Sequence, residues 1–398
     1  MPQRGRVWAE IDVDGLVHNY RKIREAAAGA MILAAVKAEA YGHGGREVAR
    51  ILEHQGVEYF GVASVEEGID LRTNGQIRKP IVLLSPVPYR EIPLIFDYNL
   101  TPNVTEQGFA KELSQEANRR SKTLGVHVEV DTGMGRSGAS LAEAPALISL
   151  IVNKPGLRLE ALFTHFPSAE HDPGFTEEQL RLFSQMVDKL VSEGFKIPLL
   201  HSANSAALFK YPTSQFDIVR PGIALYGIEP EGFENKLDLH PVMTLRTRIV
   251  NLRRLAKGSS VSYGRTCILE RDSLVATLSV GYGDGYPRSL SNKGQVLYKG
   301  RRFPILGTVC MDLTMVDLTD AATPVTPAPS PSTPAIGDEV TLIGRDADAV
   351  LGAEEVAEWA ATIPYEITTR ISPRVTRIYK TTKKILGSRT LLGSTPMP

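Results

Sequence analysis

Cysteine is scarce in this sequence, with only Cys267 and Cys310 among 398 residues. A single cysteine pair cannot stabilise a chain of this length by cross-linking, so we expect no disulfide framework and two reduced thiols. Long apolar runs are missing too, because no stretch reaches the roughly 18 apolar residues of a membrane span and the N-terminus has no apolar signal core. These absences predict a cytoplasmic protein without a membrane partner.

A surplus of charge is also absent, because Lys plus Arg and Asp plus Glu each number 45. Balanced charge gives no general attraction to nucleic acid, so the expected partner is a small molecule. Hydrophobic residues make up 42% of the chain, which is enough for a substantial core. The length favours two domains over one.

The first part of the chain alternates short apolar segments with segments of helical period, such as 46–54, 106–120 and 177–192. Repeated βα units of this kind are typical of a parallel sheet with covering helices. Eight such strands predict an α/β fold, an N-terminal (β/α)8 TIM barrel over residues 12–235. The strands are expected at 31–36, 59–63, 80–84, 100–104, 126–130, 157–164, 198–201 and 216–219.

After this region the residue pattern changes to short strands separated by turns. This predicts a mainly-β C-terminal domain at 236–385, joined by an N-terminal strand within 1–11. Gly-Asp pairs such as Gly283-Asp284 supply turns between the strands. The proline-rich stretch 321–334 is expected to be a surface loop, and 386–398 a loosely held tail. The strands are expected at 244–256, 274–280, 295–298, 304–306, 315–318 and 339–343, with a short helix at 353–361.

Chemically active side chains follow several of the predicted barrel strands at their carboxyl ends, where barrel enzymes place their chemistry. Lys37 follows a wholly apolar strand, so its amine should be partly desolvated and its pKa lowered. A neutral amine forms a Schiff base, whereas a solvated surface charge is the alternative. The candidates at strand ends are Lys37, Arg136, His165, His201, Ser205 and Arg220.

Phosphate binding in barrels commonly uses the loops after strands seven and eight. Here Ser205 can donate from its hydroxyl, Gly222 permits close approach of the backbone, and Ile223 offers an amide. Ordinary turn chemistry is the alternative for either loop taken alone.

Eight ordered motifs give the sequence a specific resemblance to alanine racemases, and the resemblance covers nearly the whole chain. They are VKAEAYGHG at 36–44, VDTGMGRSG at 130–138, HSANSA at 201–206, VRPGIALYG at 219–227, VSYGRT at 261–266, GYGDGYPR at 281–288, GTVCMD at 307–312 and PYE at 364–366.

This resemblance implies pyridoxal 5'-phosphate as the cofactor, with Lys37 bound to its aldehyde. Arg220 would face the pyridine nitrogen, where a permanent cation makes the ring a weaker electron sink than a carboxylate partner would. His165 would support Arg220 or the ring, or else be a satisfied core residue. The phosphate would be held by Tyr41, Ser205, Tyr365 and the backbone of Gly222 and Ile223.

The same resemblance implies racemisation of L-alanine and D-alanine by two bases, Lys37 on one face and Tyr263 on the other. In the family the tyrosine comes from the partner subunit, so we expect an obligate homodimer with shared active sites that supplies D-alanine for peptidoglycan. No metal site is predicted. The substrate pocket would be formed by Arg136, Met311, Asp312 and Tyr282, with Tyr282 and Tyr365 narrowing the entrance.

Two positions depart from the usual family pattern. Glu129 replaces a lysine that many members carry in carbamylated form, and we predict that its carboxylate lies near Arg136. Glu39 replaces an asparagine, with an effect that the sequence leaves open. The alternatives are a serine or broad-specificity racemase, a related decarboxylase, and a non-catalytic carrier of the cofactor. For Tyr263 and Tyr282 the structural alternative is cross-strand packing.

Overall fold

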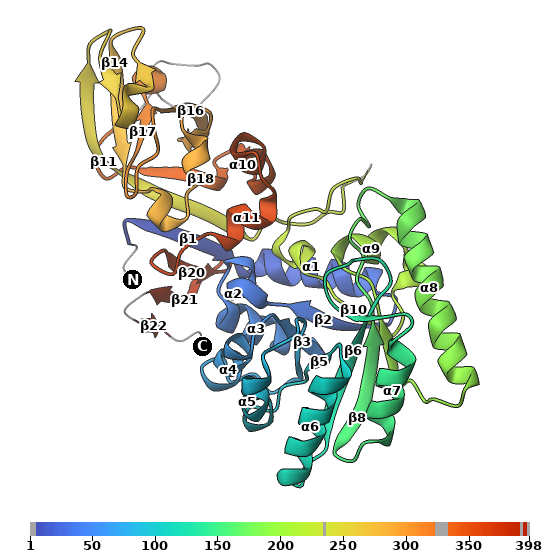
Figure 1. Ribbon diagram of the computed structural model, residues 1–398. Coiled ribbons are helices and arrows are strands. Elements are labelled where there is room, and N and C mark those ends of the chain that lie inside the picture. Colours follow the sequence, from blue (N-terminus) through green and yellow to red (C-terminus); the bar gives the residue numbers. More distant parts are fainter. Residues whose placement is uncertain (1–4, 234–235, 323–332, 391–392, 396–398) are drawn as a thin grey trace. The chain divides into compact units, whose positions relative to one another are not determined.

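The computed structural model describes residues 5–233, 236–322, 333–390 and 393–395. The chain divides into two compact units: Val17–Tyr41 with Gly45–Leu239, and Met1–Leu16 with Gly42–Gly44 and His240–Pro398 (Figure 1). Most of the predicted proline-rich loop, 323–332, lies outside the described residues. Among the helices that are described, none is long and apolar enough to cross a membrane.

The barrel unit contains a sheet of parallel strands in the order β4-β3-β2-β10-β9-β8-β6-β5. A parallel bridge between Val82 and Thr101 links β4 to the segment before β5 and closes the ring. This confirms the (β/α)8 fold and the position of each predicted strand. The strands are β2 (Met31–Ala35), β3 (Tyr59–Val62), β4 (Ile81–Leu83), β5 (Asn103–Val104), β6 (Leu124–Asp131), β8 (Leu157–Phe163), β9 (Leu199–His201) and β10 (Ile218–Val219), with β7 (Ala139–Ser140) paired to β6.

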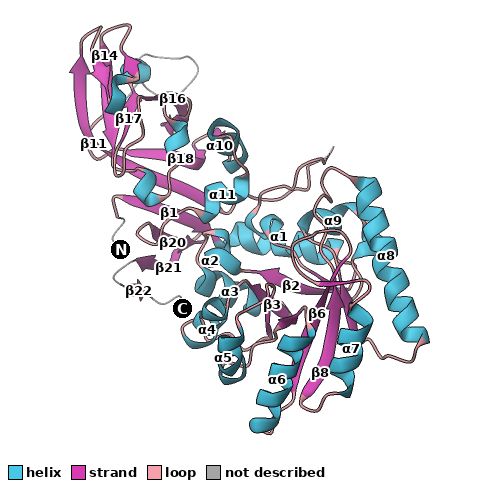
Figure 2. Ribbon diagram, viewed as in Figure 1, coloured by secondary structure: helices cyan, strands magenta, loops and turns pink. Residues whose placement is uncertain are grey.

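Helices lie outside these strands (Figure 2). The α8 helix begins at Pro173, earlier than the apolar period predicts, because the Asp172 side chain accepts from the amide of Phe175 and proline suits the first turn. The helices are α1 (Val13–Ala26), α2 (Lys37–Tyr41), α3 (Gly45–His54), α4 (Val65–Thr73), α5 (Ile92–Asp97), α6 (Gln107–Arg119), α7 (Ala144–Asn153), α8 (Pro173–Ser192) and α9 (Ser205–Lys210), with 3-10 turns η1 (Tyr89–Glu91), η2 (Pro212–Ser214) and η3 (Ile223–Tyr226).

The second unit is built on a sheet of 11 strands in the order β19-β18-β15-β16-β17-β14-β11-β1-β20-β21-β22, and β12 and β13 pair separately. This confirms a mainly-β C-terminal part, with the N-terminal strand β1 between β11 and β20. The strands are β1 (Val7–Asp12), β11 (Met243–Leu255), β12 (Ser260–Val261), β13 (Cys267–Ile268), β14 (Ser273–Leu278), β15 (Gln295–Tyr298), β16 (Arg301–Leu306), β17 (Thr314–Asp317), β18 (Glu339–Asp346), β19 (Ala349–Leu351), β20 (Thr376–Lys380), β21 (Ile385–Thr390) and β22 (Gly393–Thr395).

Helices and short turns connect these strands. The α10 helix matches the predicted helix at 353–361, and α11 follows it directly. Their bounds are α10 (Ala353–Ala360), α11 (Pro364–Thr369), η4 (Tyr263–Arg265), η5 (Tyr282–Asp284), η6 (Arg288–Leu290) and η7 (Thr319–Ala322).

Part of the expected C-terminal tail is a strand instead. The β21 strand pairs antiparallel with β20, placing Ser388 opposite Ile378. Its polar composition hid it, since backbone pairing along a neighbouring strand requires no apolar period. The prediction of a loose tail is therefore wrong for residues 386–390, and 391–392 and 396–398 lie outside the described residues.

Candidate active site

The predicted barrel residues gather at one edge of the sheet. Lys37 follows β2, Arg136 follows β6, His165 follows β8, Ser205 follows β9 and Arg220 follows β10. Because the barrel strands pair in parallel, their carboxyl ends face the same mouth. The structure thus brings together the barrel half of the predicted site.

Lys37 is partly buried at this mouth. Burial is the largest cause that lowers the pKa of its amine, and the positive charges of Arg136 and Arg220 lower it further, while Glu67 opposes them. A lowered pKa increases the fraction of neutral amine near neutral pH, which is the nucleophilic form.

The chain after Lys37 turns with left-handed geometry. Ala38, Glu39 and Ala40 have φ of 50, 56 and 52° with ψ of 52, 45 and 53°, and Tyr41 has φ of 53°. Residues with a Cβ adopt this conformation at a cost of roughly 1–2 kcal/mol each, and rarely in succession. The turn must therefore be held by its surroundings.

Backbone and side-chain contacts anchor both ends of this turn. The Ala40 amide donates to the Val36 carbonyl over 2.9 Å. The Glu39 carboxylate accepts from the amide of Gly45 over 2.9 Å, at the first residue of α3. Glu39 therefore places an anion at a helix N-terminus, where the backbone dipole favours it. That contact gives Glu39 a structural role in the turn.

Tyr41, Ser205 and Gly222 form a cradle suited to a phosphate. The Ser205 hydroxyl oxygen accepts from the Gly222 amide over 2.9 Å, and a Cβ added at Gly222 would lie 2.5 Å from the Tyr41 hydroxyl. Burial raises the pKa of Tyr41 to about 12, so its hydroxyl keeps its proton and can donate. The hydroxyls of Tyr41 and Ser205, with the neighbouring Ile223 amide, are donors of the kind that a phosphate group accepts from.

Tyr226, which was not a predicted site residue, supports this cradle. Its ring stacks on the ring of Tyr41 with centroids 5.0 Å apart, and its hydroxyl donates to the Ala35 carbonyl over 2.9 Å. The Tyr41 ring is therefore held from one face by a residue fixed to β2.

Arg220 is buried, with 6% of its surface exposed, and both of its terminal nitrogens, Nη1 and Nη2, form hydrogen bonds inside the barrel. Its guanidinium donates to the carbonyls of Thr164 and Ser202 over 2.8 and 3.0 Å, and to Nδ1 of His201 and His165 over 2.8 and 3.2 Å. Burial lowers the pKa of Arg220 to about 10, which leaves it charged at neutral pH. His165 therefore contacts Arg220, and its predicted role toward the cofactor stays a prediction.

These contacts determine where the histidine protons lie. Arg220 has no acceptor, so Nδ1 of His201 must accept and its Nε2 must carry the proton. That Nε2 lies 3.1 Å from Nδ1 of His127, another buried histidine. Burial first, and then the Arg220 charge, holds the pKa of His201 well below its usual value and that of His127 at about 3. All of these imidazoles are neutral at physiological pH.

The expected partnership between Glu129 and Arg136 is not formed. Among the described residues, the Glu129 carboxylate has no ion pair with Arg136 within 4.0 Å. It is 2% exposed and accepts instead from Asn103 over 2.7 Å and from the Ser137 hydroxyl over 2.8 Å. A buried carboxylate needs hydrogen-bond donors beside it, and Asn103 and Ser137 supply them, whereas the Arg136 side chain is exposed to solvent. Glu129 acts on the loop next to Arg136 rather than on its guanidinium.

The second predicted base lies in the β-rich unit. Tyr263 is 72% exposed, so its side chain is not a packing residue of that unit. Its backbone is fixed, because the Thr308 hydroxyl donates to the Tyr263 carbonyl over 2.9 Å and the Ser262 hydroxyl donates to the Thr308 carbonyl over 2.5 Å. The phenol is thus presented outward from a firmly anchored turn.

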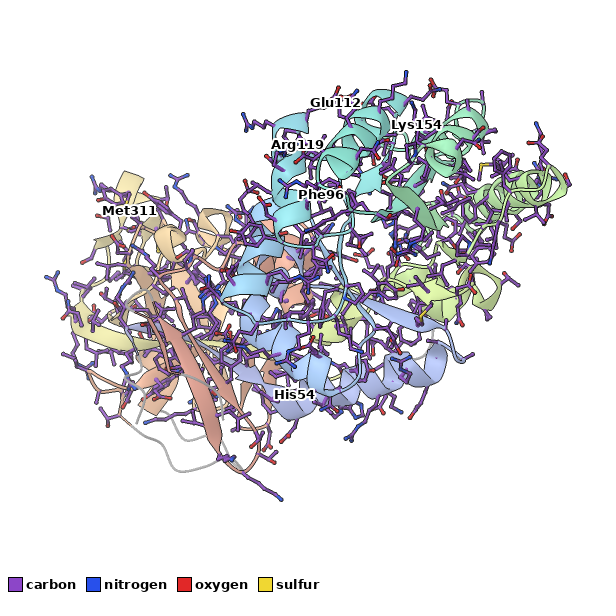
Figure 3. The ribbon with its side chains drawn as sticks, turned by 90° about the horizontal axis from the view of Figure 1, so that it is seen from below. His54, Phe96, Glu112, Arg119, Lys154 and Met311 are labelled. Atoms are coloured by element: carbon purple, nitrogen blue, oxygen red, sulfur yellow. The ribbon has the colours of Figure 1, made fainter. Side chains whose placement is uncertain are left out.

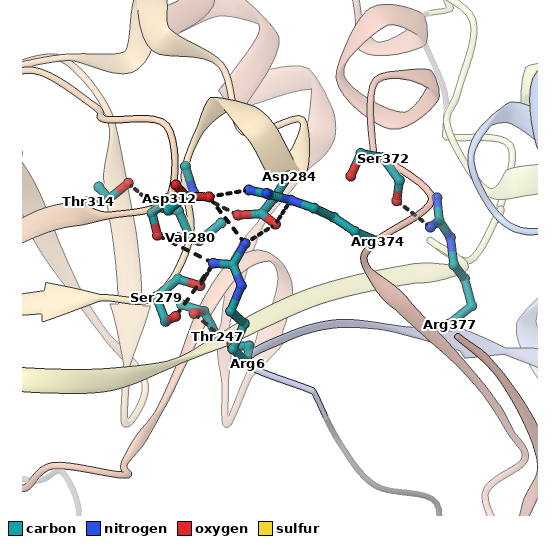
Figure 4. A network of polar contacts seen from close by, with 11 residues as sticks. Arg6, Thr247, Ser279, Val280, Asp284, Asp312, Thr314, Ser372, Arg374 and Arg377 are labelled. Carbon is teal, nitrogen blue, oxygen red and sulfur yellow. Dashed lines mark hydrogen bonds and ion pairs between the residues drawn. The ribbon is translucent and has the colours of Figure 1, made fainter. Parts of the chain in front are cut away.

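Two loops with predicted pocket residues are tied together by a polar network around Asp284 (Figure 4). Its carboxylate is 2% exposed and accepts from Arg6 over 2.7 Å and from Arg374 over 2.8 Å. Arg374 also donates to Asp312 over 2.6 Å. The network joins the turn that carries Tyr282 to the loop of Asp312.

Backbone bonds reinforce the same connection, since the amides of Tyr282 and Gly283 donate to the carbonyls of Cys310 and Met311. The Met311 and Tyr282 side chains remain exposed, Met311 on the surface of the β-rich unit (Figure 3). Tyr365 lies on α11 of this unit and is partly exposed. The roles predicted for these three residues stay predictions.

Replacing Asp284 with asparagine should destabilise the β-rich unit. Two guanidinium groups would lose the carboxylate that they share, at a cost of roughly 3 kcal/mol for a buried pair. The measurement is thermal unfolding of Asp284→Asn beside Asp320→Asn, since Asp320 is 54% exposed in its pair with Arg271 and should contribute little. Equal midpoints for both variants would contradict the importance of the network.

Replacing Gly222 with alanine should weaken binding of pyridoxal phosphate. The new Cβ would occupy the cradle against Tyr41, and overpacking of this kind costs roughly 1–3 kcal/mol, or about tenfold in affinity. Spectroscopic titration with the cofactor measures the change. The control is Gly174→Ala, where the nearest atom is 3.8 Å from the added Cβ. Unchanged affinity in Gly222→Ala would argue against a phosphate in this cradle.

Comparison with known proteins agrees with this geometry. The profile of the alanine racemase N-terminal domain matches residues 11–230, and that of the alanine racemase C-terminal domain matches 242–379. The alanine racemase of Thermodesulfovibrio yellowstonii is 44% identical over 376 residues, covering 93% of this chain and 97% of the relative. That of Halothermothrix orenii is 43% identical, covering 94% and 96%.

Solved structures of the same family are similar over nearly the full chain. The alanine racemase of Clostridium difficile has a TM-score of 0.89 at 32% identity, covering 98% of this chain and 99% of that one. The enzyme of Bartonella henselae with covalently bound pyridoxal phosphate has a TM-score of 0.84 at 31% identity, covering 94% and 100%. With both domain profiles matched in order, this chain belongs to the alanine racemase family.

Proposed function

We propose that this chain is an alanine racemase that interconverts L-alanine and D-alanine with pyridoxal 5'-phosphate. The proposal rests on the barrel mouth. The amine of Lys37, whose pKa is lowered, lies at the same edge of the sheet as Arg220 and the cradle formed by Tyr41, Ser205 and Gly222. When bound, the cofactor withdraws electrons from the amino acid and acidifies its α-proton. The related enzyme from Bartonella henselae holds this cofactor covalently.

The barrel residues would divide the work. Lys37 would hold the cofactor through its amine, and its Nζ would accept or return the α-proton on one face of the substrate. Arg136 is exposed at the mouth, where its fixed positive charge suits the substrate carboxylate. Arg220, a cation bonded to His201, would donate to the cofactor ring without transferring a proton. This restrains the ring's electron withdrawal and favours racemisation over decarboxylation.

Inversion requires an acid/base on the opposite face, and Tyr263 is the proposed group. We propose that it enters the site from the partner subunit of a homodimer. An exposed apolar surface around it supports this arrangement, because isolated units rarely leave such side chains in water together. A pocket of about 650 Å³ in the β-rich unit is lined by Tyr263, and the exposed apolar side chains of Val250 and Leu313 line the same pocket.

The β-rich unit and Tyr263 also distinguish this proposal from a carrier that binds the cofactor without turnover. For the pocket wall we propose Met311, Asp312 and Tyr282, whose bulk would favour alanine over larger amino acids. Tyr365 is proposed as a further phosphate donor. The enzyme would work in the cytoplasm and supply D-alanine for peptidoglycan.

Isotope exchange tests the reaction directly. L-alanine incubated with the protein in deuterium oxide should gain deuterium at its α-carbon and lose optical rotation. Lys37→Ala should fail to attach the cofactor, whereas Tyr263→Phe should retain it and lose racemisation by about a hundredfold or more. Wild-type protein that binds the cofactor but leaves alanine unchanged would refute the proposal, and wild-type turnover by Tyr263→Phe would refute the second base.

A mixed dimer tests whether the site is shared. In the copurified mixed dimer, Lys37→Ala and Tyr263→Phe chains should regain about half of the wild-type sites, because one of the two sites of a two-fold dimer combines an intact lysine with an intact tyrosine. The measurement is racemase activity after copurification of the two chains with different tags. The same two proteins mixed without subunit exchange are the control. No recovery in the copurified dimer would place both bases in one chain.

A further inference from the structure

The N-terminus of α4 carries a glutamate with an unusual set of partners. The sequence Ser64-Val65-Glu66-Glu67 has the pattern of a helix capping box. Half of the box is formed, because the Ser64 hydroxyl oxygen accepts from the Glu67 amide over 3.3 Å. In a complete box the Glu67 carboxylate would return to the amide of Ser64.

The carboxylate of Glu67 binds elsewhere. One oxygen accepts from the Ala38 amide over 2.6 Å, and the other accepts from the Ala63 amide over 2.7 Å. Ala63 follows β3 and Ala38 directly follows Lys37. One carboxylate therefore connects the ends of two neighbouring parallel strands through charge-assisted hydrogen bonds, which are stronger than neutral ones.

The Ala38 amide is also the first of the left-handed turn. Of the four residues of positive φ, the first three, Ala38 to Ala40, separate Lys37 from the fourth, the phosphate donor Tyr41. Glu39 anchors the far end at Gly45, and Glu67 anchors the end at Lys37. A turn of unfavourable handedness keeps its shape only while such contacts persist.

We propose that Glu67 is a positioning residue, which holds the left-handed turn through the Ala38 and Ala63 amides and so sets the placement of Lys37 relative to Tyr41. This rests on the proposed function of Lys37 and Tyr41 in binding the cofactor and deepens it. Glu67 touches neither substrate nor cofactor in this role. Its effect is to keep the amine and the phosphate cradle at the spacing that one cofactor molecule requires.

Three variants separate this role from simpler ones. Glu67→Gln keeps the shape but removes the charge and one of the two acceptors. Glu67→Asp keeps the charge but shortens the reach to the two amides. Glu66→Gln is the matched control, since Glu66 is the exposed neighbour on the same helix and bonds locally at Ser64.

Hydrogen exchange by mass spectrometry reports the turn itself, and spectroscopic titration reports the cofactor. In Glu67→Gln and Glu67→Asp, a peptide spanning 37–44 should exchange faster than in the wild type, and affinity for pyridoxal phosphate should fall about tenfold. Glu66→Gln should match the wild type in both. A helix-capping role alone would lower the melting temperature of the two Glu67 variants without changing either readout.

The pH dependence of cofactor attachment supplies a further distinction. Glu67 raises the pKa of Lys37, so removing its charge should lower that pKa and shift the attachment profile to lower pH. Glu67→Gln should show this shift and Glu67→Asp should not. If charge alone mattered, Glu67→Asp would therefore behave as the wild type in every assay.

The proposal is overturned if Glu67→Gln and Glu67→Asp both fold and show wild-type exchange at 37–44 with wild-type cofactor affinity. This result is independent of whether alanine is the substrate. Failure of the proposed function would appear in the wild-type protein, as absence of alanine racemisation, while the exchange and affinity measurements would still decide the role of Glu67.

Discussion

A guanidinium inside a barrel must have its donors satisfied by the protein, because an unpaired buried charge costs several kcal/mol. Arg220 meets this requirement with the carbonyls of Thr164 and Ser202 and with two histidines. Those partners come from the ends of β8 and β9, so the loops that form the mouth converge on one cation. The positive charge of Arg220 also keeps the neighbouring histidines unprotonated, so the guanidinium is surrounded by neutral acceptor groups. The amine of Lys37 stands in this positive environment, which favours its uncharged form.

The β-rich unit organises its part of the site by a different means. There the backbone and the buried Asp284 are held firmly, while the side chains of Tyr263, Tyr282 and Met311, for which roles at the site are proposed, are exposed. Rigid support with exposed functional groups suits a surface whose chemistry is completed by another molecule. The barrel unit gathers its candidate residues at a partly buried mouth, whereas the β-rich unit exposes its own.

The sequence predicted the barrel, its eight strands and the residues at their carboxyl ends, because apolar periods locate strands and parallel pairing gathers their ends. The sequence did not reveal the roles of residues that fit a local pattern but bond to a residue far along the chain. Glu67 fits a capping box, His127 is one polar residue in an apolar strand, and Asp284 fits a turn. Their partners lie 29, 74 and 278 positions away along the chain. For Glu129 the partners are instead close in the fold, since Asn103 and Ser137 bond the carboxylate that was expected to lie near Arg136.

The left-handed turn after Lys37 affects how the protein is arranged before the cofactor binds. Right-handed and left-handed backbone regions are separated by sterically forbidden angles, so a turn of four residues cannot drift gradually from one to the other. While the contacts of Glu67 and Glu39 hold the turn, the Lys37 amine and Tyr41 therefore keep one defined spacing. The backbone conformation of a few residues thus sets the spacing between the amine and the phosphate donor, which makes readiness for the cofactor a property of the fold.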